Sequence, residues 1–244
     1  MAITFKNDRR KFLRNAILSL PAAPFITHNP LSWSAEPQAA RASVTGSSPY
    51  CPLFFNKHEW VFIQAACDRL IPQDEFGPGA LQTEVPVFID RQLAGFFGHA
   101  AGWYMQGPFH PEASADRGYQ LPLTPQQLYR LGIAETNQCC QQHYQHDFAA
   151  LSHPQQENVL TELQHGHLTS AQLPLSVFFT FLLNNTKEGF FADPIHGGNK
   201  AMQSWRMLGY PGARAAWLEW VDKYNQPYPE GPISIQGEKI SWRE

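Results

Sequence analysis

The sequence predicts an all-α protein, with a single helical domain whose elements are joined by long ordered loops. Apolar residues in the longer segments recur every three or four positions, as on one face of a helix. Three segments begin with helix-capping signals, and no segment of useful length alternates between apolar and polar residues as a strand would. The 244 residues include 20 Pro and 17 Gly, which indicates several short elements.

The composition is that of a folded domain. Hydrophobic residues make up 43% of the chain and charged residues 16%, so the chain can form a core. The formal net charge is −3 and no basic block occurs beyond the N-terminus, which argues against nucleic acid as a partner. No apolar run is long enough for a mature membrane-spanning helix.

Two helices are predicted between residues 55 and 98. Asn56 and Glu59 have the spacing of a capping box, and Pro72 stops the helix that they begin. Its apolar face is formed by Trp60, Ile63, Cys67 and Leu70. A second helix is expected from about Thr83 to Gly98, with an apolar face of Phe88, Ile89, Leu93, Phe96 and Phe97. Residues 99–122 have no sustained period and are expected to be loop.

Five further helices are predicted in the second half of the chain. Thr124 is an N-cap followed by Pro125, and its helix is expected to run to about residue 150. Ser152 begins a shorter helix. The apolar segment 175–183 has a length between those of a strand and a helix, and we interpret it as a core helix because its neighbours are helical. The last two predicted helices are short and cover residues 201–208 and 213–224.

Residues 1–34 are predicted to be a twin-arginine export signal. Arg9 and Arg10 are adjacent, Phe12 and Leu13 follow, and a weakly apolar stretch comes next. An ordinary secretory signal with two incidental arginines is the alternative. Small residues at 32–34 and 40–42 both suit cleavage, so the site is left open. Removal of residues 1–34 takes away five basic and one acidic residue, which changes the net charge from −3 to −7.

The remaining chain is expected to form a flexible lead-in over residues 35–54, a helical domain over 55–226 and a C-terminal tail over 227–244. The sequence has no dinucleotide-binding fingerprint, no haem-attachment motif and no nucleophile elbow. We therefore predict no catalytic, cofactor-binding or metal-binding residue in this chain. The four cysteines, Cys51, Cys67, Cys139 and Cys140, are expected to form up to two disulfides or to stay as buried thiols.

The histidines provide an alternative hypothesis. Cys139, His143, His146 and Asp147 could share one helix face, and His165 and His167 form a second group. Neither group has the paired spacing of a structural zinc site. The alternative is a self-standing periplasmic metal-dependent enzyme that uses the His143/His146 region. A solute-binding protein would need a two-lobed α/β pattern, which is absent from the sequence.

Residues 187–212 carry the strongest signal. Glycines and turn formers fix the backbone, and large aromatic residues anchor it. The aromatic residues either fill the core of this domain or dock a partner. We predict a partner interface that consists of Gly189, Phe190, Phe191, Asp193, Pro194, Gly197, Gly198, Asn199, Trp205, Tyr210 and Pro211.

These motifs resemble those of a known family. Glu188–Pro194, Gly197–Asn199, Trp205 and Gly209–Gly212 are similar to the signature of the gluconate 2-dehydrogenase subunit 3 family. Two further segments of the family pattern are Cys67–Pro72 and Gly118–Pro125. The resemblance covers about residues 55–215. His196 departs from it, because the family more often has Tyr at that place.

The resemblance implies a small, non-catalytic subunit without a redox group. Its expected partners are a large FAD-dependent subunit of the glucose-methanol-choline type, a cytochrome c subunit with haem c, and the twin-arginine translocase. The small subunit would carry the export signal for the catalytic subunit and assist its maturation and stability. The resemblance implies a periplasmic, membrane-associated complex that oxidises a sugar or sugar acid. The substrate and the electron acceptor would be selected outside this chain.

Overall fold

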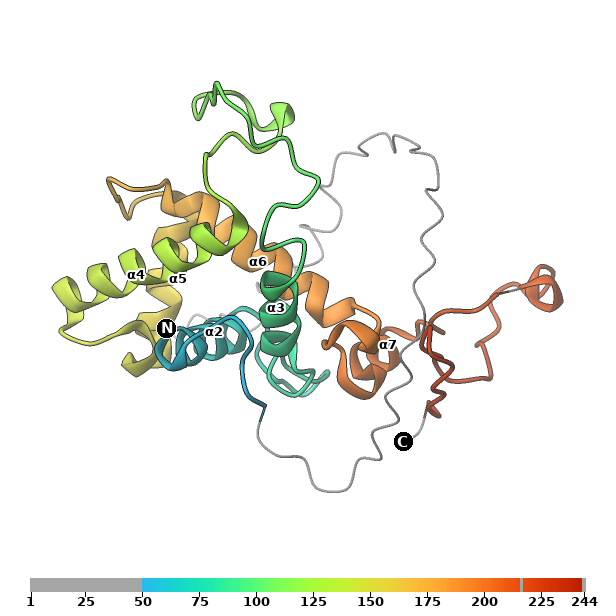
Figure 1. The fold of residues 1–244 in the computed structure, drawn as a ribbon. Coiled ribbons are helices and arrows are strands. Elements are labelled where there is room, and N and C mark those ends of the chain that lie inside the picture. The colour runs from blue at the N-terminus through green and yellow to red at the C-terminus, as the bar shows by residue number, and fades with distance from the viewer. Residues whose placement is uncertain (1–49, 216, 243–244) are drawn as a thin grey trace. The chain divides into compact units, whose positions relative to one another are not determined.

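The computed structural model describes residues 50–215 and 217–242. These residues contain six α-helices and no strand, which confirms the all-α prediction for this part of the chain (Figure 1). The predicted signal segment 1–34 and the lead-in residues up to 49 lie outside the described residues. The helices are α2 (Lys57–Leu70), α3 (Val85–Ala94), α4 (Pro125–Tyr144), α5 (His153–His165), α6 (Leu175–Phe191) and α7 (Gln203–Leu208).

The capping signals place three helix starts correctly. The Asn56 carboxamide accepts hydrogen bonds from the amides of His58 and Glu59, and the Asn56 amide donates to the Glu59 carboxylate. Thr124 begins α4 in the same way, and at the start of α5 the Ser152 amide and hydroxyl both donate to the Gln155 side-chain oxygen, at 3.0 and 2.7 Å. Each capping residue satisfies amide groups that have no partner within the first turn of a helix.

Two helices end earlier in the structure than the sequence predicts. Helix α3 ends at Ala94 because Gly95 has an extended backbone, and Phe96 is consequently exposed instead of lying on the core face. Helix α4 ends at Tyr144 because Gln145 has a left-handed backbone with a φ of 61°. A separate 3₁₀ turn, Phe148–Ala150, then brings Phe148 into the core.

The other two corrections concern α6 and the end of the chain. Helix α6 continues to Phe191, so residues 187–191 are helical and do not belong to a loop. Gly189 permits this extension because its bare Cα lies against the Phe88 ring of α3. The helix predicted at 213–224 is wrong, and only Leu218–Trp220 form a 3₁₀ turn there. Its apolar residues are exposed, and a short helix gains most of its stability from a buried face.

Helix α6 contacts α3, α4 and α5 and forms much of the core with them (Figure 1). The Phe178 ring of α6 is fully buried and lies edge-on to the Tyr129 ring of α4, with the ring centroids 5.5 Å apart. Close approach of the two helices depends on Gly132, since a Cβ atom there would lie 2.2 Å from Cγ of Phe178. The absence of a side chain at Gly132 of α4 therefore leaves the space that the Phe178 ring of α6 fills.

Candidate functional site

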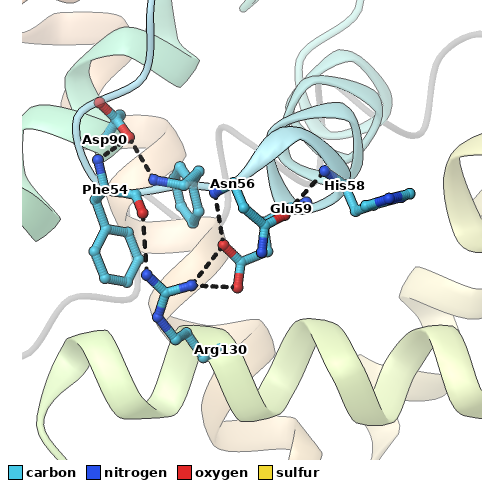
Figure 2. Close-up of polar contacts among 7 residues, drawn as sticks. Phe54, Asn56, His58, Glu59, Asp90 and Arg130 are labelled. Atoms are coloured by element: carbon cyan, nitrogen blue, oxygen red, sulfur yellow. Dashed lines mark hydrogen bonds and ion pairs between the residues drawn. The ribbon is translucent and has the colours of Figure 1, made fainter.

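Residues 50–56, here called the entrance segment, are held by a buried carboxylate of α3. Asp90 is fully buried and accepts hydrogen bonds from the amides of Phe54 and Phe55 at 3.0 Å (Figure 2). The Leu53 amide donates to Asp90 at 2.7 Å. The Tyr50 hydroxyl donates a fourth bond of 2.7 Å. Four donors saturate a carboxylate. Asp90 is thus committed to holding the backbone and has no lone pair left for acid–base chemistry.

Burial and the Asp90 carboxylate raise the pKa of Tyr50 well above its ordinary value of 10.0. Burial is the larger cause, because it disfavours the charged phenolate. The Tyr50 hydroxyl therefore stays protonated and remains a hydrogen-bond donor to Asp90.

Helix α4 holds the entrance segment from the other side. Nη1 of Arg130 donates to both carboxylate oxygens of Glu59, at 2.7 and 2.8 Å, and Nη2 donates to the Phe54 carbonyl oxygen at 3.1 Å (Figure 2). The guanidinium also lies over the Phe54 ring, 4.4 Å from its centroid. Together Asp90 and Arg130 fix the start of the domain to α2, α3 and α4. Sequence analysis missed both residues, although a lone aspartate in an apolar helix is a signal that could have identified Asp90.

The segment that follows α6 is held by two polar side chains, those of Asn199 and Trp205. Asn199 is fully buried, donates to the Ala192 carbonyl oxygen at 2.9 Å and accepts from the Ser204 amide at 3.0 Å. Trp205 donates its indole N–H to the Phe191 carbonyl oxygen at 2.8 Å. The side chains of Asn199 and Trp205 find these partners within the segment, so their fixed geometry serves the fold.

The predicted interface residues divide into two sets. A buried set forms the framework of the segment and comprises Gly189, Phe190, Asp193, Gly198, Asn199 and Trp205. The accessible set comprises Phe191, Pro194, Gly197, Tyr210 and Pro211. Phe191 and Tyr210 are exposed and both contact Trp205, which donates to the Phe191 carbonyl oxygen and has its ring centroid 5.2 Å from that of Tyr210. Of the predicted interface, these two side chains offer the largest apolar surface to a partner, and their role in binding stays a prediction.

The arrangement proposed for a metal site at the end of α4 does not form. His143 lies in the last turn, but the left-handed Gln145 takes His146 and Asp147 off that helix face. Asp147 instead accepts a hydrogen bond from Gln141 at 2.8 Å. His165 and His167 lie with ring centroids 5.5 Å apart. No group of three or more His, Cys, Asp or Glu residues is placed to hold a metal ion in the described part of the chain.

All four cysteines are free thiols, and they differ in accessibility. Cys51 is exposed, whereas burial raises the pKa of Cys67 and of Cys140 to about 12. Burial also raises the pKa of the partly exposed Cys139. The thiolate is the reactive form, so a raised pKa lowers reactivity at neutral pH.

We expect a thiol reagent at pH 8 to modify Cys51 rapidly and Cys139 more slowly in the folded protein. Cys67 and Cys140 should react only after denaturation, when all four thiols become accessible. The absorbance of the product that the reagent releases, followed over time without reductant, measures the order in which the thiols react. A denatured protein with fewer than four reactive thiols would contain a disulfide and would contradict the structure.

Sequence comparison decides the assignment of this helical domain. The family model described as gluconate 2-dehydrogenase subunit 3 matches residues 57–212. The chain belongs to the gluconate 2-dehydrogenase subunit 3 family. The family is that of subunit 3 of gluconate 2-dehydrogenase, an oxidoreductase complex. The resemblance predicted from the sequence is therefore confirmed.

The subunit 3 match begins at the first residue of α2 and ends at Gly212, after α7. It includes Glu59, Asp90 and Arg130 and all of residues 187–212, here called the signature segment. No curated protein and no solved structure matches the chain. Within the described residues of this subunit 3 protein, no helix has both the length and the apolar character needed to cross a membrane.

Proposed function

We propose that this chain is the non-catalytic small subunit of an exported, membrane-associated FAD-dependent dehydrogenase that oxidises a sugar or sugar acid in the periplasm. The family match over residues 57–212 carries the proposal. The proposed partners are a large flavin-bearing subunit of the glucose-methanol-choline type and a cytochrome c subunit with haem c. The saturated bonds of Asp90 and Asn199 support a structural role for the polar residues of this chain.

The proposed action is physical. The small subunit binds the folded flavoprotein in the cytoplasm, and the twin-arginine translocase exports the pair through the signal that this chain carries. Arg9, Arg10, Phe12 and Leu13 support this role. The bonds of the entrance segment also support it, because residues 53–56 are attached to three helices and join the preceding residues to the folded domain.

Conversion of Arg9 and Arg10 to Lys tests the export role. We expect Arg9→Lys/Arg10→Lys to retain the large subunit and its dehydrogenase activity in the cytoplasm, because the translocase recognises the arginine pair and not its charge alone. Activity and flavin are measured in periplasmic and cytoplasmic fractions of the native host. Lys6→Arg, a conservative change in the same basic region, should leave the distribution unchanged.

The two possible failures have different meanings. Normal export of the large subunit with the double variant would refute the carrier role. Absence of any flavoprotein bound to the wild-type chain, in either compartment, would refute the proposed subunit role itself.

A further inference from the structure

A C-terminal arm, residues 213–215 and 217–242, follows the family domain and is ordered by its own backbone contacts. The Ala213 amide donates to the Ile233 carbonyl oxygen at 2.8 Å, and the Ile240 amide donates to that of Pro232 at 3.2 Å. Asp193 of the signature segment accepts a bond of 2.8 Å from the Ile235 amide. The base of the arm is thus fixed to the domain that precedes it.

The tip of the arm, residues 217–228, is built around the Tyr228 ring. The rings of Trp217 and Trp220 lie 5.2 and 5.0 Å from it, centroid to centroid. The Arg214 guanidinium lies 4.8 Å from the same centroid and donates to the Gly231 carbonyl oxygen at 2.6 Å. These contacts shape the tip without burying its outer side chains.

The tip presents a set of exposed apolar side chains. Leu218 is 85% exposed and Tyr224 78% exposed, and Val221 and Trp217 are exposed beside them. Burial of one such side chain stabilises a structure by about 1.5–3 kcal/mol, and the contacts within this chain provide the tip with little of that stabilisation. An ordered segment that leaves several large apolar residues in water is typical of a surface that another molecule covers.

The charges on the tip favour one kind of occupant. Glu219 and Asp222 are exposed on the same turn, whereas the Lys223 ammonium lies over the Trp220 ring at 4.3 Å from its centroid. Exposed carboxylates disfavour an anionic lipid surface. A second copy of this chain, with a net charge of −3, would also be acidic. A protein surface with basic side chains complements the tip in charge, and its apolar residues would bury Trp and Tyr.

We propose that the tip docks in an apolar groove bordered by Lys or Arg on the large subunit of the same dehydrogenase complex. This inference rests on the proposed function. Because the arm lies outside the matched residues 57–212, it adds a second contact to the one predicted at Phe191 and Tyr210. The tip would hold the partner through its aromatic and aliphatic side chains, and the two carboxylates would orient it.

A pair of matched double variants tests the proposal. Leu218→Ala/Tyr224→Ala removes two exposed tip side chains, and we expect it to raise the dissociation constant for the purified large subunit roughly tenfold or more. The control is Leu53→Ala/Tyr104→Ala, which removes the same residue types at positions outside the tip, where they are 70% and 80% exposed. The control should bind as the wild type does. Full-length protein is titrated with the flavin-bearing subunit, and unfolding midpoints check that both variants fold.

The charge argument has its own test. Glu219→Lys/Asp222→Lys should slow association and reverse the effect of salt, because like charges would then face each other.

Equal binding by the wild type and the tip variant would overturn the tip proposal and leave the proposed function intact. Failure of the wild type to bind the flavoprotein would overturn both. Tip-dependent flotation with phosphatidylglycerol vesicles, or tip-dependent dimerisation, would overturn the tip proposal in favour of those occupants.

Discussion

Asp90→Ala is expected to destabilise this protein strongly. It removes the common acceptor of three backbone amides and of the Tyr50 hydroxyl. A buried donor without a partner costs about 1–3 kcal/mol, and the Phe55 amide in particular has no access to water. We expect a loss of about 3–6 kcal/mol from a total that is typically about 5–15 kcal/mol.

Denaturant unfolding of the full chain measures this loss, and two graded variants test its cause. Tyr50→Phe removes one of the four donors and should cost about 1 kcal/mol. Asp90→Asn keeps the shape but turns one acceptor into a donor that faces backbone N–H groups, so its effect should fall between the other two. A loss for Asp90→Ala no greater than that for Tyr50→Phe would show that the amide bonds contribute little.

Gly198→Ala is the second substitution that we expect to destabilise the protein strongly. A Cβ atom at this position would lie 2.0 Å from the Gly189 carbonyl oxygen and 2.8 Å from its carbonyl carbon. Both atoms are backbone atoms at the end of α6, so no side chain can rotate away to relieve the overlap. We expect a loss of about 2–4 kcal/mol in the free energy of unfolding, together with displacement of the segment that carries Tyr210.

Gly95→Ala provides the matched control for this prediction. The new Cβ atom would lie 3.4 Å from the Arg91 carbonyl oxygen, which is an acceptable contact. We expect a change of about 0.5 kcal/mol or less. Thermal unfolding of both variants under the same conditions gives the comparison, and equal stability of the two would refute the close approach of segment 197–199 to α6.

The helix starts were predictable because their signals are local. Asn56, Thr124 and Ser152 each lie three residues before the Glu or Gln that completes a capping box, and all three begin a helix. The helix ends were less predictable. Helix α6 passes residue 183 because Gly189 fits against Phe88, a residue about a hundred positions earlier in the chain, and no local pattern encodes that contact.

The polar framework was predictable only in part. The motif at 187–212 located the buried Asn199 and Trp205, because turn formers and aromatic residues occur together there. Asp90 and Arg130 were missed, because their partners lie 35 or more positions away in the sequence. Helical spacing at 213–224 was misleading, since a helix there would have no surface against which to bury its apolar face.

The Asp90 bonds have a consequence for the order of events after synthesis. The amides of Leu53, Phe54 and Phe55 leave the ribosome before Asp90, and Arg130 follows much later. The hydrogen bonds of these amides can form only when α3 lies beside the entrance segment, and the bond from Arg130 to the Phe54 carbonyl oxygen forms only when α4 has joined them. Slow deuterium exchange at these three amides is therefore a readout of the packing of α3 against the entrance segment, located at the start of the domain. A nascent or misfolded chain would exchange there rapidly, and it would also offer this segment to proteases.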